Sequence, residues 1–304
     1  MMSPSIQLQP LKIHYRLTDS WQRPEFMGSR LRGMFGHSLR QQVCTEHLPN
    51  CGLCPKLKRC AYPQVFESLP NGTQRMPPAF VLKPPPMGEQ QLHAGDLITF
   101  GQILFAPAIP WLTDTLLAWE CAHFEENTAG IELKNIELTD LNNKVLQEWQ
   151  PGHPMPTALP QQTHIPIHES NHVTIELITP LRLREKGKDI KPNQLKAHHI
   201  VMSAMRRLRL IAPSVADNSL LAKLPAPVMH SWAQSLQMDA DIRWVDLQRW
   251  SNRQQKEVPI SGITGIITLR GNLQPYLPAL HLLPLIGLGK HCNFGLGQVR
   301  IIAN

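Results

Sequence analysis

The sequence predicts an α+β protein in which a β-α-β-β-α-β order of elements occurs twice. Strand-like and helix-like periodicities alternate in the same order in both halves of the chain. A proline-rich stretch without periodicity separates the halves. The 304 residues suffice for two domains of about 150 residues each. We therefore expect a first domain over residues 1–149, a linker over 150–168 and a second domain over 169–304.

The first half opens with a strand and a helix. Residues 6–17 alternate between apolar and polar, which suits a half-buried strand. Residues 29–43 suit an amphipathic helix, because Leu31 and Phe35 share one apolar stripe. The segment from the following cysteines to Pro86 is expected to be loop. The further elements expected are a strand, a helix and a strand, over residues 94–105, 113–124 and 130–141.

The second half repeats this order. Residues 172–180 suit a strand, and residues 193–211 suit a helix with Ala197, Val201 and Leu208 at helical spacing. Two such units make tandem ferredoxin-like (RRM-like) domains, an architecture that RNA-recognition modules share. The remaining elements expected are a strand, a strand, a short helix and a strand, over residues 242–250, 262–271, 273–283 and 293–302.

The composition indicates an ordinary globular protein. Hydrophobic residues make up 42% of the chain and charged residues 17%, whereas disordered chains carry far less apolar material. No run approaches the roughly 20 apolar residues of a membrane span. The first residues lack the pattern of a signal peptide. We expect a cytoplasmic protein with no membrane partner.

The positive charge lies in the second half. Residues 1–160 hold 13 Lys and Arg against 14 Asp and Glu, whereas residues 161–304 hold 17 against 9. Such an excess favours a polyanion as partner, because each neutralised phosphate releases a counterion. The alternative is a solvated basic face with no partner.

Four of the six cysteines form a cluster with the spacing C-x6-C-x2-C-x5-C. The cytoplasm keeps thiols reduced, so we do not expect these cysteines to form a disulfide framework. A C-x2-C turn lets two thiolates approach one tetrahedral ion, and four sulfur ligands leave no open position. We expect a structural zinc ion, with an iron–sulfur cluster and free thiols as alternatives. His47 could replace one ligand. The four cysteines are Cys44, Cys51, Cys54 and Cys60.

The predicted helix over residues 29–43 carries a polar face with chemistry. Gly33, His37 and Arg40 fall opposite the apolar stripe. An imidazole beside guanidinium groups suits RNA cleavage, in which His accepts the 2′-hydroxyl proton and Arg stabilises charge on the phosphorus centre. The alternative is a surface histidine in a basic helix.

Two further segments suit contact with a phosphate backbone. Between residues 180 and 210 nine Lys and Arg face only Glu185 and Asp189, and the KGK at 186–188 suits a hairpin tip. His198 and His199 nearby are weaker catalytic candidates. Residues 287–297 form a glycine-rich loop around Lys290, whose backbone N–H groups could approach phosphates. The basic residues expected to bind RNA in the first segment are Arg182, Arg184, Lys186, Lys188, Arg206, Arg207 and Arg209.

Several segments, taken in order, resemble one family. They are LRGMFGHSLR (31–40) with the four cysteines behind it, TPLRLREKGK (179–188), RRLRL (206–210), WVDLQRWSNRQ (244–254) and GLGKHCNFGLGQVRI (287–301). Together they are similar to the CRISPR pre-crRNA-processing endoribonucleases of the RAMP superfamily, the sixth Cas family. The likeness extends over nearly the whole chain.

The resemblance implies metal-independent cleavage of CRISPR repeat RNA by its own 2′-hydroxyl, which leaves a 2′,3′-cyclic phosphate. It implies that His37 is the general base, that Arg40 and Arg32 are further catalytic candidates, and that no cofactor takes part. Tyr15 could lie beside the first helix. The resemblance further implies RNA contacts at Gly287, Gly289, Lys290, Gly295 and Gly297. Arg249 and Arg253 are either further RNA contacts or a pair that fixes the loop between two strands.

Two other functions stay open from the sequence. One is a non-catalytic crRNA-binding subunit of a CRISPR effector complex, with other Cas subunits as partners. The other is a zinc-dependent DNA-binding module, which the missing recognition-helix pattern disfavours. Cleavage of a repeat RNA separates the first alternative from the nuclease.

Overall fold

Each half of the chain builds an antiparallel sheet in which the first strand of that half is central. The computed structural model describes residues 5–71, 74–124, 130–164, 170–213, 226–251 and 255–302. They divide into an N-terminal unit, Ile6–Thr163, and a C-terminal unit that begins at His164. The strand orders are β5-β7-β1-β8-β9 in the N-terminal unit and β14-β17-β11-β18 in the C-terminal unit.

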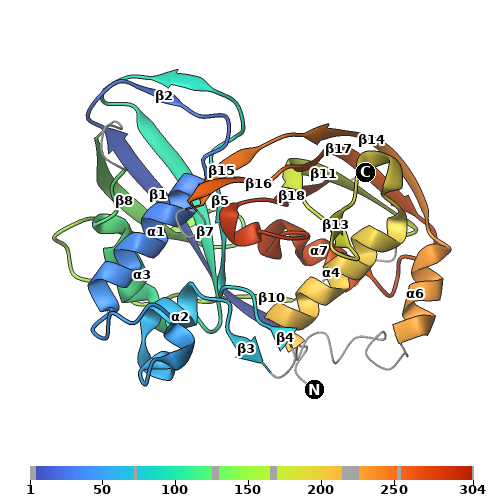
Figure 1. Ribbon diagram of the computed structural model, residues 1–304, viewed down its shortest axis with the longest axis horizontal. Coiled ribbons are helices and arrows are strands. Elements are labelled where there is room, and N and C mark those ends of the chain that lie inside the picture. Colours follow the sequence, from blue (N-terminus) through green and yellow to red (C-terminus); the bar gives the residue numbers. More distant parts are fainter. Residues whose placement is uncertain are drawn as a thin grey trace. The chain divides into compact units, whose positions relative to one another are not determined.

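The N-terminal unit has ferredoxin-like topology. Its four principal strands lie so that the first is flanked by the third and the fourth, with two helices as crossovers. Figure 1 shows these helices side by side on one face of the sheet. The elements are β1 (Ser5–Leu17), α1 (Gly28–Val43), β5 (Phe80–Lys83), β7 (Leu97–Phe105), α3 (Leu112–Glu120) and β8 (Ile131–Thr139), extended by β9 (Val145–Trp149).

The segment expected to be loop before Pro86 contains the second strand of this fold. The apolar run of β5 pairs with β7 at the edge of the sheet, where Phe80 and Leu82 are buried. Four residues are too few to show a period, so only the sheet reveals this strand. The same segment holds η1 (Cys51–Leu53), η2 (Leu57–Arg59), α2 (Ala61–Val65), β3 (Pro70–Asn71) and β4 (Gln74–Arg75).

Three other short elements complete the N-terminal unit. β2 (Trp21–Arg23) pairs with β6 (Gln90–Leu92), and η3 (Ile109–Trp111) leads into α3. β10 (Gln161–His164) pairs with β1, so four residues of the expected linker over 150–168 belong to a sheet. Their backbone groups gain partners from β1, which a local pattern of prolines does not reveal.

The C-terminal unit repeats the topology. α4 and α7 pack against each other, and α6 packs against α4 (Figure 1). The principal elements are β11 (His172–Leu181), α4 (Ala197–Ile211), β14 (Gln237–Val245), β17 (Gly262–Arg270), α7 (Leu277–Ile286) and β18 (Val299–Ile302). The prediction of two tandem ferredoxin-like domains is therefore confirmed.

Additional elements decorate the C-terminal unit. The hairpin of β12 (Arg184–Glu185) and β13 (Lys188–Asp189) turns at Lys186 and Gly187, which both have positive φ, as a two-residue hairpin turn requires. This confirms the hairpin tip expected at 186–188. The other elements are η4 (Pro192–Gln194), α6 (Ala226–Gln234), β15 (Gln248–Ser251), β16 (Lys256–Pro259) and η6 (Cys292–Phe294).

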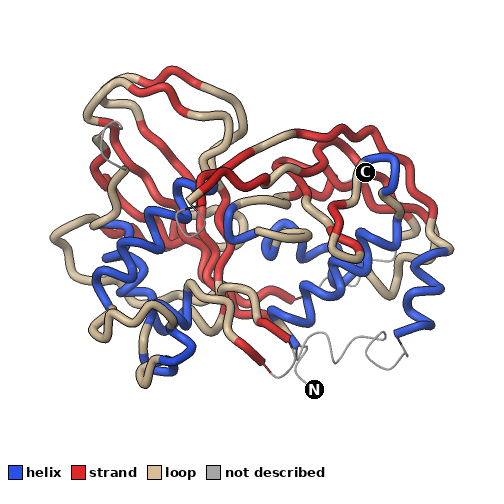
Figure 2. The backbone as a smooth tube through the Cα atoms, viewed as in Figure 1, coloured by secondary structure: helices blue, strands red, loops and turns tan. Residues whose placement is uncertain are grey.

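Two predicted strands are interrupted. The strand expected over 242–250 is divided between β14 and β15, because the amide of Leu247 bonds to Ser261 Oγ at 3.0 Å instead of continuing the ladder. The final strand begins only at Val299, since positive φ values at Gly295 and Gly297 are incompatible with an extended ladder. In the tube view of Figure 2, the segment that connects α7 to this strand is drawn mostly as loop.

Aromatic rings fill the core of the N-terminal unit. Phe35 of α1 stacks on Trp119 of α3 with ring centroids 4.9 Å apart, and it meets Phe80 edge-on at 5.3 Å. The Trp119 indole N–H donates to Gln102 Oε1 at 2.7 Å, so its polar atom is satisfied inside the core. Within the described ranges, no helix has both the length and the apolar character that a membrane crossing requires.

The two glycines of α1 have different surroundings. A Cβ atom at Gly36 would lie 2.1 Å from Cζ of Phe66, whereas a Cβ atom at Gly33 would meet nothing within 4 Å. Phe66 itself is buried against Phe35 and Phe80. The close approach that Gly36 permits is therefore made by the chain's own aromatic ring.

We predict opposite effects of alanine at these two glycines. Gly36→Ala should lower the free energy of unfolding by about 1–3 kcal/mol, because the methyl group overpacks Phe66. Gly33→Ala should raise it by about 0.4–1 kcal/mol through reduced freedom of the unfolded chain. Urea unfolding followed by tryptophan fluorescence measures both, and equal stability of the two variants would contradict the packing argument.

Candidate functional site

The exposed face of α1 presents His37. His37 and Gly33 are exposed one turn apart, while Leu31, Phe35 and Leu39 of the same helix are buried at 0–1% exposure. The missing side chain at Gly33 leaves open space on the His37 side of the helix. The imidazole is thus accessible to a large ligand, as a general base acting on RNA must be.

The arginines of α1 are engaged with the protein. Arg32 lies over the Phe66 ring, with Cζ 4.1 Å from the centroid. Arg40 donates to the carbonyl of Leu48 at 2.6 Å and lies 5.6 Å from the Tyr62 ring. Both side chains are half-buried. Arg40 thereby connects α1 to the cysteine segment, and its role at a phosphate stays a prediction.

Tyr15 is a core residue. It is 1% exposed, and its hydroxyl donates to the carbonyl of Trp119. Burial raises the pKa of this phenol far above its ordinary value. Tyr15 packs in the same core as α1, and its buried hydroxyl is not accessible to a large ligand. In a strand that alternates inward and outward, position 15 shares the inward face with Leu11 and Ile13.

The four clustered cysteines occupy one half-exposed segment after α1. Cys51 and Cys60 pack against the aromatic core, and burial raises the pKa of both thiols. All four cysteines are half-buried and free. Within the described part of the chain, however, no three of the four sulfurs all lie within 4.8 Å of one another. A zinc ion would require these sulfurs to move closer.

Side-chain bonds hold the cysteine segment in a closed loop. Lys56 Nζ lies 2.8 Å from Glu46 Oε1 and donates to Thr45 Oγ1 at 2.8 Å. Asn50 Oδ1 accepts from the amide of Gly52 at 2.9 Å, which starts the turn that contains Cys51 and Cys54. These bonds fix the backbone of the segment that contains Cys51 and Cys54.

The glycine-rich loop of the C-terminal unit is mostly buried. Gly287, Gly289, Gly295 and Gly297 all have positive φ. A Cβ atom at Gly289 would lie 2.6 Å from the carbonyl oxygen of Arg182, and one at Gly297 would lie 1.8 Å from a backbone oxygen. The glycines are thus required by the loop's own packing.

The backbone amides of this loop already have partners. Lys290 N–H donates to the carbonyl of Arg182 at 2.9 Å, and Gly297 N–H donates to Pro180 at 3.0 Å. Leu288 N–H donates to the Gly297 carbonyl at 2.9 Å. Gly287, Gly295 and Gly297 are buried and Gly289 is half-buried, and contact of this loop with phosphates stays a prediction. Lys290 is the exposed residue that the loop presents.

Arg182 connects this loop to neighbouring segments through its side chain and its carbonyl group. It is 9% exposed, and it donates to both carboxylate oxygens of Asp189 at 3.0 and 2.9 Å. Its Nη1 donates to the carbonyl of Pro259 at 2.9 Å and lies 3.4 Å from His291 Nε2. The bidentate pair is a strong, directional contact. The prediction that Arg182 contacts RNA is corrected: its side chain joins the β12–β13 hairpin, β16 and the glycine-rich loop.

The exposed cations near this framework form a basic cluster. Partial burial and the charges of Arg206, Arg184 and Arg182, in that order, lower the pKa of the Lys290 ammonium. Like charges held this close favour an anionic ligand. We use the name basic cluster for Arg184, Lys186, Lys188, Arg206 and Lys290, which are all exposed.

The other predicted RNA contacts differ in accessibility. Arg207 is half-buried and donates to the carbonyl of Ile286 at 2.6 Å, so it fixes the end of α7. Arg209 is exposed and reaches Met229 Sδ at 3.5 Å. Arg249 lies over the Phe294 ring at 4.8 Å, and burial lowers its pKa. Arg253 lies outside the described residues.

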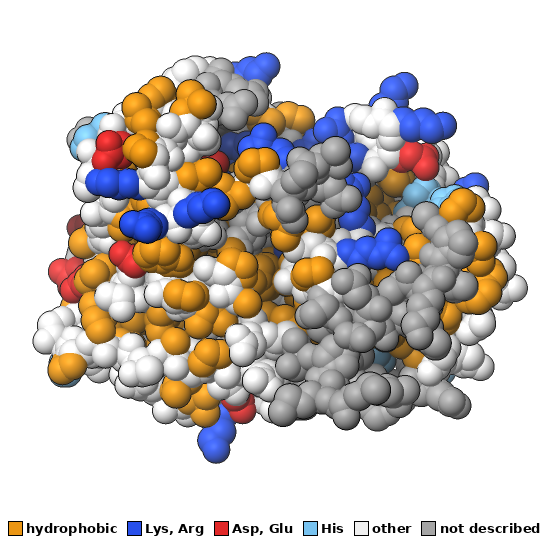
Figure 3. Space-filling model, turned by 90° about the horizontal axis from the view of Figure 1, so that it is seen from below, with side chains coloured by type: hydrophobic (Ala, Val, Ile, Leu, Met, Phe, Trp, Pro, Cys, Tyr) orange, Lys and Arg blue, Asp and Glu red, His pale blue; other side chains and the backbone are white. Residues whose placement is uncertain are grey.

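His198 and His199 lie at the start of α4, close to the β12–β13 hairpin. Burial lowers the pKa of both imidazoles, and the charges of His199 and His230 lower that of His198 further. On one side of the face drawn in Figure 3, His side chains gather near Lys and Arg and an acidic side chain. The ring centroid of His230, on α6, lies 5.2 Å from that of His198. No strong periodicity marks α6, so the sequence did not reveal His230.

Comparison with protein families assigns the chain. A family model described as the CRISPR-associated endoribonuclease Cas6 matches residues 175–299. A second model, AF_1859_N, described as an N-terminal domain, matches residues 6–161. Residues 175–299 therefore form a domain of the Cas6 family. The resemblance carried by the sequence motifs is confirmed.

Solved Cas6 structures share this fold over nearly the whole chain. Thermus thermophilus Cas6 (TTHB231) matches with a TM-score of 0.55 at 14% identity, covering 98% of this chain and 99% of its own. A Cas6 (TTHA0078) product complex matches with a TM-score of 0.53 at 17% identity, covering 98% and 100%. A partial Cas6-RT-Cas1–Cas2 complex gives 0.57 at 13% identity, covering all of this chain and 47% of that chain.

One curated relative is an uncharacterized protein of Archaeoglobus fulgidus. It is 30% identical over 101 residues, which are 33% of this chain. The match spans 35% of the relative's length. The similarity to this protein thus concerns a part of each chain.

The contacts of Arg182 with Asp189 and Pro259 can be tested by substitution. Arg182→Ala should lower the free energy of unfolding by about 2 kcal/mol, because Asp189 and the Pro259 carbonyl lose a charged donor. Arg184→Ala is the matched control, since Arg184 Nε also pairs with Asp189, at 3.3 Å, but from the surface. That substitution should change stability by less than about 1 kcal/mol. Urea unfolding compares them, and equal losses would show that Arg182 carries no special role.

Proposed function

We propose that this protein is a cytoplasmic endoribonuclease that cleaves CRISPR repeat RNA without a metal ion and keeps hold of the product. The match of residues 175–299 to the Cas6 family model supports endoribonuclease activity. The observation that carries the proposal is the accessible His37 on a helix whose opposite face is anchored in the core.

The proposed reaction uses the RNA's own hydroxyl. His37 takes the proton from a ribose 2′-hydroxyl, and the 2′-oxygen attacks the adjacent phosphorus. The bond from phosphorus to the 5′-oxygen breaks, and that oxygen takes up a proton as it leaves. The products are a 2′,3′-cyclic phosphate and a 5′-hydroxyl. General base catalysis of this kind contributes about 10²–10⁴-fold.

The basic cluster is the proposed grip on the RNA backbone. Its five side chains come from the hairpin, α4 and the glycine-rich loop, and all are exposed. The lowered pKa of Lys290 supports a concentration of positive charge that an RNA phosphate would relieve. Arg182 would support RNA binding by fixing the backbone of the hairpin and of the glycine-rich loop, which carry Arg184 and Lys290.

The proposed partners are repeat RNA and other Cas proteins. Two similar structures are described as Cas6 product complexes, and another as a Cas6-RT-Cas1–Cas2 complex. These are complexes of other proteins. Their similarity to this chain supports CRISPR RNA and Cas subunits as its partner classes. A chain that binds repeat RNA without cutting it would act instead as a crRNA-binding subunit.

A structural zinc ion at Cys44, Cys51, Cys54 and Cys60 is part of the proposal. The neighbouring thiols and the preformed turn at Cys51 and Cys54 support it. Four thiolates would leave no open position for a substrate, so the ion would stabilise the segment that Arg40 connects to α1. No step of the proposed cleavage passes through this ion.

The catalytic part of the proposal is tested at His37. We expect His37→Ala to lower the single-turnover cleavage rate of a labelled repeat RNA by about 10²–10⁴-fold, with RNA affinity nearly unchanged. End-group analysis should find the cyclic phosphate in the wild-type product.

The matched control is His93→Ala, which removes another exposed histidine of the same unit. Its cleavage rate should equal that of the wild type. An unimpaired His37→Ala protein would overturn the assignment of the base, and uncut RNA with the wild type would favour the non-catalytic subunit.

The grip is tested by salt dependence. We expect Lys290→Ala to weaken RNA binding for every sequence and to reduce the slope of log affinity against log salt by about 1, because one phosphate contact is lost. Fluorescence anisotropy at several salt concentrations gives the slope. Lys144→Ala, which removes an exposed lysine of the N-terminal unit, should leave it unchanged. An unchanged slope for Lys290→Ala would remove this residue from the interface.

A further inference from the structure

A cluster of metal-binding side chains lies where the β12–β13 hairpin meets α4. One ligand atom from each of Glu185, His198 and His199 lies within 4.8 Å of the other two. His199 Nε2 is 3.7 Å from Glu185 Oε1, and the two histidine rings have centroids 4.0 Å apart. The cluster plays no part in the proposed cleavage, whose base is on α1.

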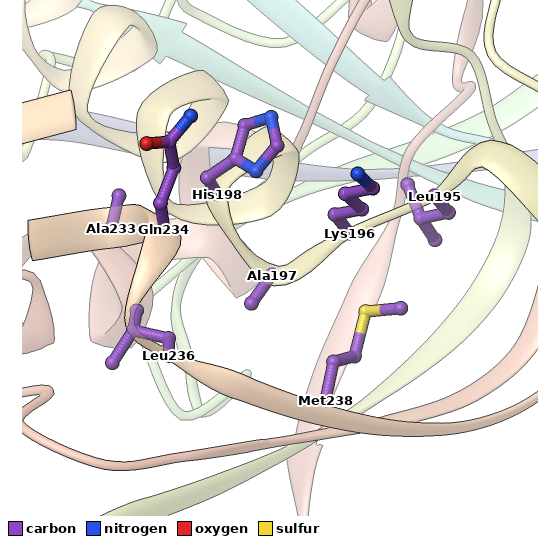
Figure 4. Close-up of a pocket in the computed structure, with 8 residues that line it drawn as sticks. All are labelled: Leu195, Lys196, Ala197, His198, Ala233, Gln234, Leu236 and Met238. Atoms are coloured by element: carbon purple, nitrogen blue, oxygen red, sulfur yellow. The ribbon is translucent and has the colours of Figure 1, made fainter. Parts of the chain in front are cut away.

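The cluster combines rigid backing with access from solvent. The histidines are half-buried on the first turn of α4, whereas Glu185 is exposed on the hairpin. His198 also lines a pocket of about 390 Å³. Figure 4 shows His198 and Gln234 on one side of this pocket, with Leu236 and Met238 on the other. The exposed Glu185 and the partly exposed histidines leave the cluster open to a hydrated ion.

We propose that Glu185, His198 and His199 bind a divalent transition-metal ion of the class of Ni²⁺, Co²⁺ or Zn²⁺. Two imidazoles and one carboxylate are donors that these ions prefer, whereas Mg²⁺ and Ca²⁺ prefer oxygen donors alone. Three protein ligands leave open positions for water. His230, next to His198, is the nearest additional imidazole donor described.

The hydrogen bonds of His199 specify what changes when the ion binds. His199 Nδ1 accepts from the Lys196 amide at 3.1 Å, so the neutral ring carries its proton on Nε2. A metal ion at Nε2 takes the place of that proton and requires the ring proton on Nδ1. The bond from the Lys196 amide is then lost, which gives a signal specific to this geometry.

Charge makes Glu185 the critical ligand. The ammonium of Lys196 acts on both histidines, and Lys186 and Lys188 lie on the same hairpin as Glu185. These cations oppose a bound cation, and the carboxylate offsets them. The bound ion would tie the hairpin to α4 and so fix the part of the basic cluster that the hairpin carries.

The test is a titration with Ni²⁺ of the full chain loaded with one molar equivalent of Zn²⁺, which the soft thiolates of the cysteines bind in preference to two imidazoles and a carboxylate. Isothermal titration calorimetry should show one further site in the wild type. Glu185→Gln, at an exposed hairpin position, should weaken Ni²⁺ binding at least tenfold. His198→Gln should do the same, and His172→Gln, at a histidine of the same unit beside Asn171, should leave it unchanged.

A second readout follows the Lys196 amide in ¹⁵N-lysine-labelled protein. Its resonance should shift on addition of a second equivalent of Zn²⁺, which is diamagnetic, in the wild type and stay in place in Glu185→Gln. Equal Ni²⁺ affinity in the wild type and both variants, or no shift at Lys196, would overturn the site. Because no RNA is present in either measurement, the outcome is independent of whether the chain cleaves RNA.

Discussion

The buried guanidinium of Arg182 organises the surface of the C-terminal unit. Arginine keeps its charge when it is buried, so its surroundings must supply acceptors for its N–H groups. Asp189 and the Pro259 carbonyl do so, and the Arg182 carbonyl in turn accepts from the Lys290 amide. Three segments that are distant in sequence are thereby fixed at one place. The exposed Arg184 and Lys290 belong to two of them, so the basic cluster depends on a cation that is not itself at the surface.

In the N-terminal unit, apolar contacts fix the helix that carries the exposed His37. α1 must bury one face and present His37 on the other, and its burial relies on Phe35 against Trp119 and Phe80. Gly36 lets the Phe66 ring approach the helix, and Arg32 covers that ring from the side. The exposed histidine thus stands on a helix with little freedom to shift. A general base benefits from such fixed support, since proton transfer depends on position.

The C-terminal unit presents two kinds of polar chemistry from neighbouring elements. The basic cluster consists of guanidinium and ammonium groups, which suit phosphate. The histidines of α4 with Glu185 are neutral donors and a carboxylate, which suits a metal ion. The hairpin contributes Arg184 to the first and Glu185 to the second. A change in its position would therefore affect both.

The sequence by itself determined the order of elements, because hydrophobic periods of 3.6 and 2 residues show in local composition. It identified the buried stripe of α1, the turn at Lys186 and Gly187, and the family, whose motifs occur in order along the chain. It missed β5, which has only four residues and becomes a strand through its pairing with β7. Only the tertiary structure decided which cations face solvent: Arg182 and Arg184 are two residues apart, yet one is buried and the other exposed. The reason is that burial of a charge depends on acceptors that folding brings together, here Asp189 across the hairpin and Pro259 from β16, and no local pattern encodes that arrangement. The same holds for the glycines of the loop and for Tyr15, whose neighbours come from other strands and helices.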